Sequence, residues 1–365
     1  MGSSANAKYL VTGGAGFVGS NLVAALVATG ERVRVLDNLS TGFWENLDGI
    51  AQQSLIERVT GDIRDPEAVA KACRGVEVVF HEGALGSVPK SVAKPIDSDA
   101  SNVGGTVTVL DCARHAGVRR VIFAASSSAY GETVELPKHE RIVPQPLSPY
   151  AVSKLACEMY LRVFASLYGI ETLSLRYFNV FGPAQTPDGA YAAAIPRFLD
   201  RALTGRPIEI FGDGEQTRDF CFVKNTVTAN LLAASTPKKL TGQAVNIAGG
   251  RRITLNELVR EIGRVLGPRA DESGQPREVS AVHGPERPGD IRHSLGDISL
   301  ARDLLGYEPS VKWEDGIAPT AEYLTKLRQE NLSAASRVMA ALWSAGSVHA
   351  ESGLGATPTA VGRPA

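Results

Sequence analysis

The sequence predicts an α/β protein built on a doubly wound parallel sheet, with a smaller C-terminal α/β lobe. Two observations lead to this prediction. Short β-branched runs alternate with helical patterns through the first half of the 365-residue chain, and long loops rich in Gly and Pro appear from about residue 180 onward. With 44% hydrophobic residues, the chain can bury a sizeable core in two lobes.

The elements of the first lobe follow in order. Strands are expected at Tyr9–Val11, Val33–Leu36, Val76–Phe80 and Val121–Phe123, and helical patterns lie at 17–29, 66–73, 101–116 and 149–168. Helices of these lengths suit crossovers between parallel strands. The second lobe is expected to hold helices near 191–204, 224–235, 254–266 and 314–330.

Composition argues against several classes of protein. The formal net charge is −1, so no general basic field is present to attract nucleic acid or an anionic membrane. The chain has no run of about 18 apolar residues and no signal-peptide pattern in its first residues, so we expect a cytoplasmic protein without a membrane span. The four cysteines lack paired spacings, so neither a metal site nor a disulfide framework is expected.

A glycine-rich turn follows the first strand and precedes a helix. In the run Thr12–Gly19, Gly13, Gly16 and Gly19 allow the backbone to approach a pyrophosphate, and the following helix, through Phe17 and Val18, offers N-terminal amides. Asp37 ends the second strand, where a carboxylate binds ribose hydroxyls and repels a 2′-phosphate, so NAD is favoured over NADP. Arg34 should face away from this site if the strand alternates.

Asp62 and Ile63 follow a third strand and suit the adenine edge of a dinucleotide. For Asp62 alone, a role as a helix N-cap explains the residue equally well.

Candidate catalytic groups lie further along the chain. Tyr150 and Lys154 are four residues apart on one face of an expected helix, and an adjacent ammonium favours the phenolate form of a tyrosine, which can then act as a base. The strand Val121–Phe123 runs into Ser126, Ser127 and Ser128. Ligands of open α/β sheets bind at the carboxyl ends of the strands, so these hydroxyls are placed to share the proton path or to orient a substrate hydroxyl.

Taken together, these motifs make residues 8–330 resemble the extended short-chain dehydrogenase/reductase family with its Rossmann domain, and within it the nucleotide-sugar 4-epimerases. The resemblance rests on Thr12–Gly19, Asp37–Asn38, Asp62–Asp65, the serine triplet, Tyr150–Lys154 and Arg176–Pro183. It implies a tightly held NAD, with Asn38, Gly83 and Tyr177 added to the cofactor contacts. It also implies Tyr150 as base and acid, Lys154 as the cation that favours the phenolate, and Ser126 as partner of the reacting hydroxyl.

The resemblance further implies a UDP-sugar substrate. Ser87, Ser127 and Ser128 would contact the sugar, whereas Asn179, Arg218, Arg287 and Asp290 would bind the diphosphate and uridine ribose. In related epimerases a bulky side chain at the position of Ser294 closes the pocket to N-acetylated sugars. A serine there implies interconversion of UDP-GlcNAc and UDP-GalNAc, with UDP-Glc and UDP-Gal as weaker substrates.

One position departs from the family pattern. Glu82 and Gly83 stand where relatives more often carry a neutral or apolar pair beside the nicotinamide. A buried carboxylate costs free energy unless it is paired, so Glu82 is expected to face solvent or to bind a hydroxyl.

Other functions occur on the same scaffold. Dehydratases resemble this chain but place an Asp-Glu pair where Ser128 and Ala129 stand, so elimination is disfavoured, and so is decarboxylation. UDP-glucuronate 4-epimerase remains an alternative, as does a non-catalytic, NAD-sensing protein of this fold. The resemblance also implies a homodimer that forms through the helices at 101–116 and 149–168.

The expected organisation has four parts. Residues 1–7 would be a flexible N-terminus and 8–180 the NAD-binding domain, to which later segments at about 215–250 return. Residues 181–330 would form the substrate-binding lobe. Residues 331–365, rich in Ser, Ala and Gly, would be a disordered tail, although its apolar patch Val338–Trp343 is also compatible with a short docked helix.

Overall fold

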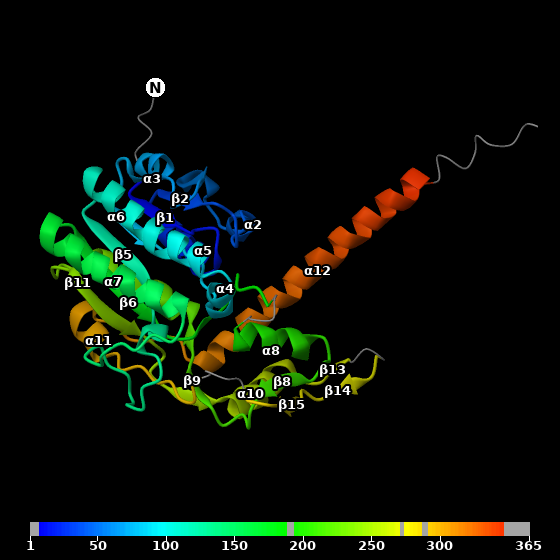
Figure 1. The fold of residues 1–365 in the computed structure, drawn as a ribbon. Helices are drawn as coiled ribbons and strands as arrows, with labels where there is room; N and C mark the ends of the chain where they lie inside the picture. Colours follow the sequence, from blue (N-terminus) through cyan, green and yellow to red (C-terminus); the bar gives the residue numbers. More distant parts are fainter. Residues whose placement is uncertain (1–6, 188–192, 271–273, 287–290, 347–365) are drawn as a thin grey trace, which may run out of the picture.

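The computed structural model describes residues 7–187, 193–270, 274–286 and 291–346. Its main sheet has the strand order β11-β6-β5-β4-β1-β2-β3, and every neighbouring pair is parallel. The strands are β1 Tyr9–Thr12, β2 Val33–Asp37, β3 Ile56–Thr60, β4 Val78–His81, β5 Arg120–Ser126, β6 Glu171–Tyr177 and β11 Thr241–Ile247. The predicted doubly wound parallel sheet is therefore confirmed (Figure 1).

Helices cover both faces of this sheet. They are α1 Phe17–Ala28 and α9 Val223–Ser235 on one face, and α3 Pro66–Cys73, α6 Gly105–His115 and α7 Pro149–Tyr168 on the other. Alternate side chains of each strand point to opposite faces, so Val11 joins the core under α1 whereas its neighbour Leu10 joins the core under α6 and α7. Burial on both sides explains why β4 and β5 are almost entirely apolar.

Short elements connect the larger ones. They are α2 Glu45–Asp48, α4 Val88–Ala93, α5 Pro95–Asp99, and the 3-10 turns Gln53–Leu55 and Ser127–Tyr130. A π-helical stretch, Ala100–Gly104, leads directly from α5 into α6. The helix expected at 101–116 thus begins in a widened turn, a feature that is common at functional sites.

The second lobe combines short strand pairs with helices. Strands β7 Val180–Phe181 and β10 Cys221–Phe222 pair in parallel, as do β8 Ile208–Phe211 and β15 Ala281–Gly284, whereas β9 Thr217–Asp219 with β12 Arg252–Thr254 and β13 Arg269–Ala270 with β14 Pro276–Arg277 are antiparallel. The helices are α8 Ala194–Leu203, α10 Leu255–Leu266, α11 Ser299–Leu305 and α12 Trp313–Gly346.

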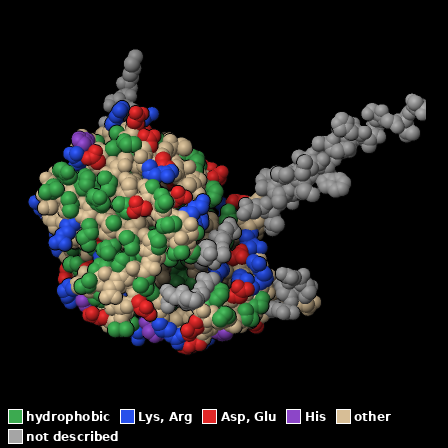
Figure 2. All heavy atoms as spheres, in the orientation of Figure 1, with side chains coloured by type: hydrophobic (Ala, Val, Ile, Leu, Met, Phe, Trp, Pro, Cys, Tyr) green, Lys and Arg blue, Asp and Glu red, His purple; other side chains and the backbone are tan. Residues whose placement is uncertain are grey.

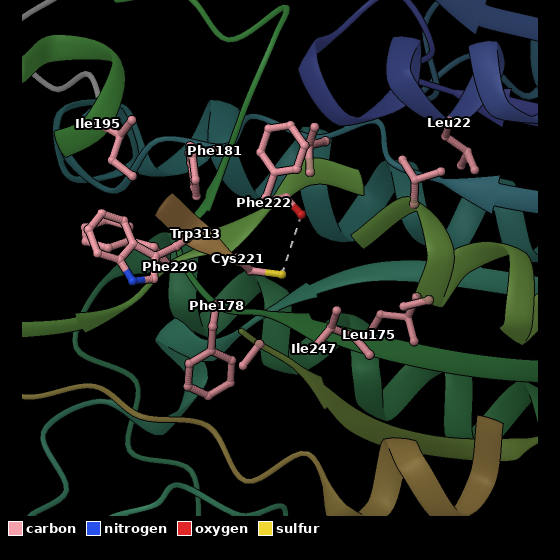
Figure 3. Packing of buried hydrophobic residues seen from close by; sticks show 14 of the residues in the cluster. Leu22, Leu175, Phe178, Phe181, Ile195, Phe220, Cys221, Phe222, Ile247 and Trp313 are labelled. Carbon is pink, nitrogen blue, oxygen red and sulfur yellow. Dashed lines mark hydrogen bonds between the residues drawn. The ribbon is translucent and has the colours of Figure 1, made fainter. Parts of the chain in front are cut away.

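One apolar core continues from the main sheet into this second lobe. Phe181, Phe222 and Trp313 pack in the same cluster as Leu175 and Ile247 of the sheet (Figure 3). The lobes therefore share packing, which fixes the edge of the second lobe against the carboxyl ends of the strands.

The end of the chain differs from the expectation for residues 331–365. Helix α12 begins at Trp313 and runs to Gly346, and in Figure 1 its far end leads away from the rest of the molecule. Residues 331–346 are therefore helical, because their Ala, Leu, Met and Arg content favours a helix more than the Ser and Gly content opposes it. Residues 1–6 and 347–365 lie outside the described ranges. Neither α12 nor any other described helix is long and apolar enough to cross a membrane.

Candidate active site

The turn between β1 and α1 is shaped for close approach of another molecule. Gly13 has a φ of +68°, and a Cβ at Gly19 would lie 2.2 Å from the carbonyl oxygen of Gly13, so both positions need glycine. Helix α1 begins at Phe17, and its N-cap residue, Gly16, has no side chain to cap the helix. Its N-terminal amides, including those of Phe17 and Val18, are therefore available to an anion such as a pyrophosphate.

Asp37 lies beside this turn. Its carboxylate accepts hydrogen bonds from the backbone N–H groups of Ala15 (3.0 Å) and Leu39 (2.8 Å), and it keeps further lone pairs for ribose hydroxyls. Arg34, earlier on the same strand, donates to the carbonyl oxygens of Ala72 and Arg74, so it faces away from the turn as predicted. These residues fit an NAD without a 2′-phosphate.

Asp62 forms a small polar cluster with Asn38 and Arg64. Its carboxylate accepts from Asn38 Nδ2 (2.8 Å) and pairs with Arg64 (2.8 Å), and the hydrogen bond from Arg64 holds the pKa of Asp62 well below its usual range. Ile63 is buried next to it. The structure thus brings Asn38 and Asp62 together, and Asp62 does not cap a helix, since Asp65 caps α3.

Tyr150 and Lys154 lie in the first turns of α7, which Ser148 caps through the N–H of Ala151. The Tyr150 ring is half-exposed, and its centroid lies 6.0 Å from the ammonium of Lys154. Lys154 is buried, and its Nζ donates to the carbonyl oxygen of Ala124 on β5 (2.7 Å). This bond fixes the ammonium at the carboxyl end of β5, two residues before Ser126.

The serines follow directly. Ser126 ends β5, and its Oγ accepts from both the N–H (3.2 Å) and the Oγ (2.8 Å) of Ser128. Ser126, Ser127 and Ser128 are all half-exposed. The carboxyl end of β5 therefore presents hydroxyl groups beside the turn of α7 that carries Tyr150 and Lys154.

The carboxylate of Glu82, the residue that departs from the family pattern, has a hydrogen-bond partner in the structure. The Glu82 Oε1 accepts a hydrogen bond from the Tyr177 hydroxyl (2.8 Å), which in turn accepts from Asn230 Nδ2 (2.8 Å). Glu82 therefore binds a hydroxyl, the second of the two expectations. Burial raises the pKa of the Glu82 carboxyl to about 7, although the Tyr177 hydrogen bond and the charge of Lys154 act in the opposite direction. Gly83 packs closely against Gly13. A Cβ on Gly13 would lie only 2.6 Å from the Gly83 Cα, so this contact requires glycine at position 13.

Two buried residues that sequence reasoning missed hold these parts together. His81 contacts Thr12 Oγ1 (2.7 Å) and Thr106 Oγ1 (3.0 Å), and burial lowers its pKa to about 3, so it joins β1, β4 and α6 as a neutral ring. Asn102, in the π-helical turn, bonds Leu85 and Ser153. Each of the two residues connects segments that are distant in sequence, so no local pattern reveals these contacts.

A second group of predicted residues lies at the edge of the second lobe. Asn179 and Arg218 both line a cavity of about 200 Å³, together with Phe211, Gln216 and Phe220 among other residues. Ser294 is buried, and its N–H donates to the carbonyl oxygen of Thr217, the residue before Arg218 (3.1 Å). These three predicted residues are therefore brought to one region, whereas Arg287 and Asp290 lie outside the described residues.

Asp219 holds this region in place and was not predicted. It is fully buried and accepts the N–H groups of Gly249 (2.8 Å) and Gly296 (3.1 Å), so it ties β9 to two loops. Asn179 Nδ2 donates to its carbonyl oxygen (3.2 Å). Ser87, predicted to contact the sugar, uses its Oγ to accept from the Lys90 N–H at the start of α4 (3.3 Å).

The fold and site define the class of the protein: a doubly wound dinucleotide-binding enzyme with a tyrosine and a lysine at the carboxyl end of its sheet. Residues 9–248 match the NAD dependent epimerase/dehydratase family, and the chain belongs to this family.

Individual relatives agree with this placement. The UDP-glucose 4-epimerase of Mycolicibacterium smegmatis is 38% identical over 324 residues, which cover 88% of this chain and 100% of that protein. The structure of UDP-N-acetylglucosamine 4-epimerase from Methanobrevibacter ruminantium M1, in complex with UDP-N-acetylmuramic acid, has a TM-score of 0.81 and 36% identity, covering 88% of this chain and 99% of that one. UDP-glucuronic acid 4-epimerase from Bacillus cereus, in complex with UDP-glucuronic acid and NAD, has a TM-score of 0.79 and 29% identity, with 87% and 99% covered. The chain is thus a member of the NAD dependent epimerase/dehydratase family, and the three relatives named here are UDP-sugar 4-epimerases.

Proposed function

We propose that this enzyme interconverts UDP-GlcNAc and UDP-GalNAc through a 4-keto sugar, with UDP-Glc and UDP-Gal as weaker substrates. The choice of sugar rests on Ser294, a small buried residue whose N–H bonds to Thr217, next to Arg218 in the chain. In related epimerases a bulky side chain at this position closes the pocket, so a serine is expected to leave room for an acetamido group. The similarity to a UDP-N-acetylglucosamine 4-epimerase supports the same choice.

In this proposal Tyr150 removes the proton of the sugar 4-hydroxyl and later returns a proton to the same oxygen, after the sugar has turned its other face toward the hydride. Lys154, anchored on Ala124, would hold a positive charge 6.0 Å from the centroid of the Tyr150 ring while the proton is transferred. Ser126 orients the reacting hydroxyl. A bound NAD would supply the acceptor, and then the donor, of the hydride at C4. The glycine turn, Asp37 and Tyr177 would hold the cofactor.

Binding of the nucleotide would let the sugar turn between the two steps. Arg218 and Asn179 line one cavity, so a diphosphate held there remains fixed while the ring rotates about its link to phosphate. Arg287 and Asp290 would add contacts to the phosphate and the uridine ribose. Ser127, Ser128 and Ser87 would contact the sugar.

A panel of UDP-sugars tests the proposal. Purified enzyme given UDP-GlcNAc alone should form UDP-GalNAc, since no second substrate is required, and should turn over UDP-Glc more slowly. Replacement of Ser294 by Tyr should lower the rate on UDP-GlcNAc much more than the rate on UDP-Glc. Absence of UDP-GalNAc, or an unchanged ratio of the two rates in the variant, would remove the assignment of the sugar.

UDP-glucuronate is the second candidate substrate. The arginines expected at the phosphate site are also able to pair with a sugar carboxylate, and the B. cereus enzyme acts as a precedent for that substrate on this fold. The panel therefore includes UDP-glucuronate, and faster turnover of it than of UDP-GlcNAc would make it the preferred assignment. Bound NAD without turnover of any sugar would indicate a sensor instead.

A further inference from the structure

Glu82 lies between the glycine turn after β1 and Tyr177 at the end of β6. It follows β4, and its N–H donates to the carbonyl oxygen of Thr12 at the start of the glycine turn (3.2 Å). Its carboxylate reaches across the end of β5 to Tyr177, at the end of β6. The glycine turn suits the pyrophosphate, and Tyr150 with Lys154 suits the reacting end. Glu82 therefore lies along the stretch that the nicotinamide half of the cofactor spans.

The surroundings of Glu82 favour a fixed position for its carboxylate. Tyr177 donates to it from β6, and Asn230 of α9 holds the Tyr177 hydroxyl in place. Lys154 of α7 lies close enough to act on it electrostatically, and burial opposes the charged form. A partly buried carboxylate held in this way is screened less by water than one in solvent, so it exerts a stronger field.

We propose that the charge of Glu82 stabilises the oxidised, positively charged nicotinamide ring relative to its neutral reduced form. The advantage of this effect to the enzyme depends on the proposed function. A site that favours the oxidised cofactor returns the hydride promptly, so the keto sugar is short-lived. Reduction of the ring adds a hydride equivalent, two electrons and one proton, and removes the positive charge. A negative charge nearby therefore makes reduction less favourable.

The test is a redox titration of the holoenzyme against an indicator dye couple at about pH 8.5, with bound NADH followed by absorbance. At a given potential, Glu82→Gln should raise the ratio of reduced to oxidised cofactor about tenfold, which is about 30 mV for a two-electron couple. Gln keeps the shape and an acceptor for Tyr177, so only the charge changes. A rise smaller than about threefold overturns the proposal.

A matched control uses Glu77, an exposed residue just before the other end of β4. Glu77→Gln removes the same charge at the opposite end of the same strand and should leave the ratio unchanged. An equal shift in both variants would mean that net charge, rather than the position of Glu82, sets the potential, and would overturn the proposal. No sugar is present in the titration, so its outcome is independent of which UDP-sugar the enzyme uses.

Discussion

At the scale of single residues, the site combines groups that the chain could not easily keep buried alone. Lys154 satisfies its ammonium with the Ala124 carbonyl, Glu82 uses the Tyr177 hydroxyl, and Asp219 takes two backbone amides. Buried polar groups without such partners cost of order 1–3 kcal/mol each. These hydrogen-bond partners therefore fix the positions of the three charged side chains.

Glu82 should make stability depend on pH. Its pKa is raised from 4.5 to about 7, so the folded state holds the proton more tightly than the unfolded chain. The stabilising contribution of this group is present below pH 4.5 and is lost as pH rises through about 7. We therefore compare the free energies of unfolding of cofactor-free wild type and Glu82→Gln in urea. Between pH 5 and pH 8, the stability of the variant relative to wild type should rise by about 1–3 kcal/mol. An equal pH response in both proteins would contradict this.

At the scale of elements, α7 is fixed to the sheet by a buried ion pair. Arg176 of β6 donates Nε and Nη2 to the two oxygens of Glu158 on α7 (2.8 and 2.7 Å), and its guanidinium lies 4.7 Å from the Tyr130 ring centroid. Because α7 carries Tyr150 and Lys154, this ion pair helps to hold the turn with these two residues against β5 and β6.

Breaking that pair from one side should be costly. Arg176→Met leaves the Glu158 charge buried and unpaired and should lower the free energy of unfolding by about 3–5 kcal/mol, measured by urea denaturation. The double variant with Glu158→Leu should recover most of that loss, since neither charge remains. If the double variant is as unstable as the single one, the loss comes from packing and the electrostatic argument is wrong.

Local patterns predicted much of the fold and part of the site. The glycine turn and the Tyr150–Lys154 spacing are short-range features, so they could be read along the chain. Strands β6 and β11 and helix α11 were not among the expected elements, and α12 extends past its expected end. The bond between Glu82 and Tyr177 joins residues 95 apart on strands that are not neighbours, and only the assembled sheet reveals it.

At the scale of the whole molecule, one face of α7 is apolar and exposed. Val152 is 52% exposed, Val163 46% and Leu167 69%, and Figure 2 shows hydrophobic side chains gathered on this side of the molecule. Monomeric proteins rarely leave such a patch open. We propose that it forms the expected homodimer contact, together with α6.

Analytical ultracentrifugation tests this contact. Val163→Asp with Leu167→Asp should convert a dimer to a monomer, because two like charges would be desolvated in the interface. Val134→Asp, at a loop residue 99% exposed and away from α7, is the control and should stay dimeric. A wild-type monomer, or a dimer that survives the double substitution, would refute the proposed interface.

The central claim is that Tyr150 transfers the proton at the sugar C4 hydroxyl. The most direct measurement compares wild type and Tyr150→Phe for turnover of UDP-GlcNAc and for bound NAD content. The account predicts unchanged fold and NAD content, with turnover reduced by several orders of magnitude, since the ring remains and only the hydroxyl is lost. Near-normal turnover in Tyr150→Phe would contradict it.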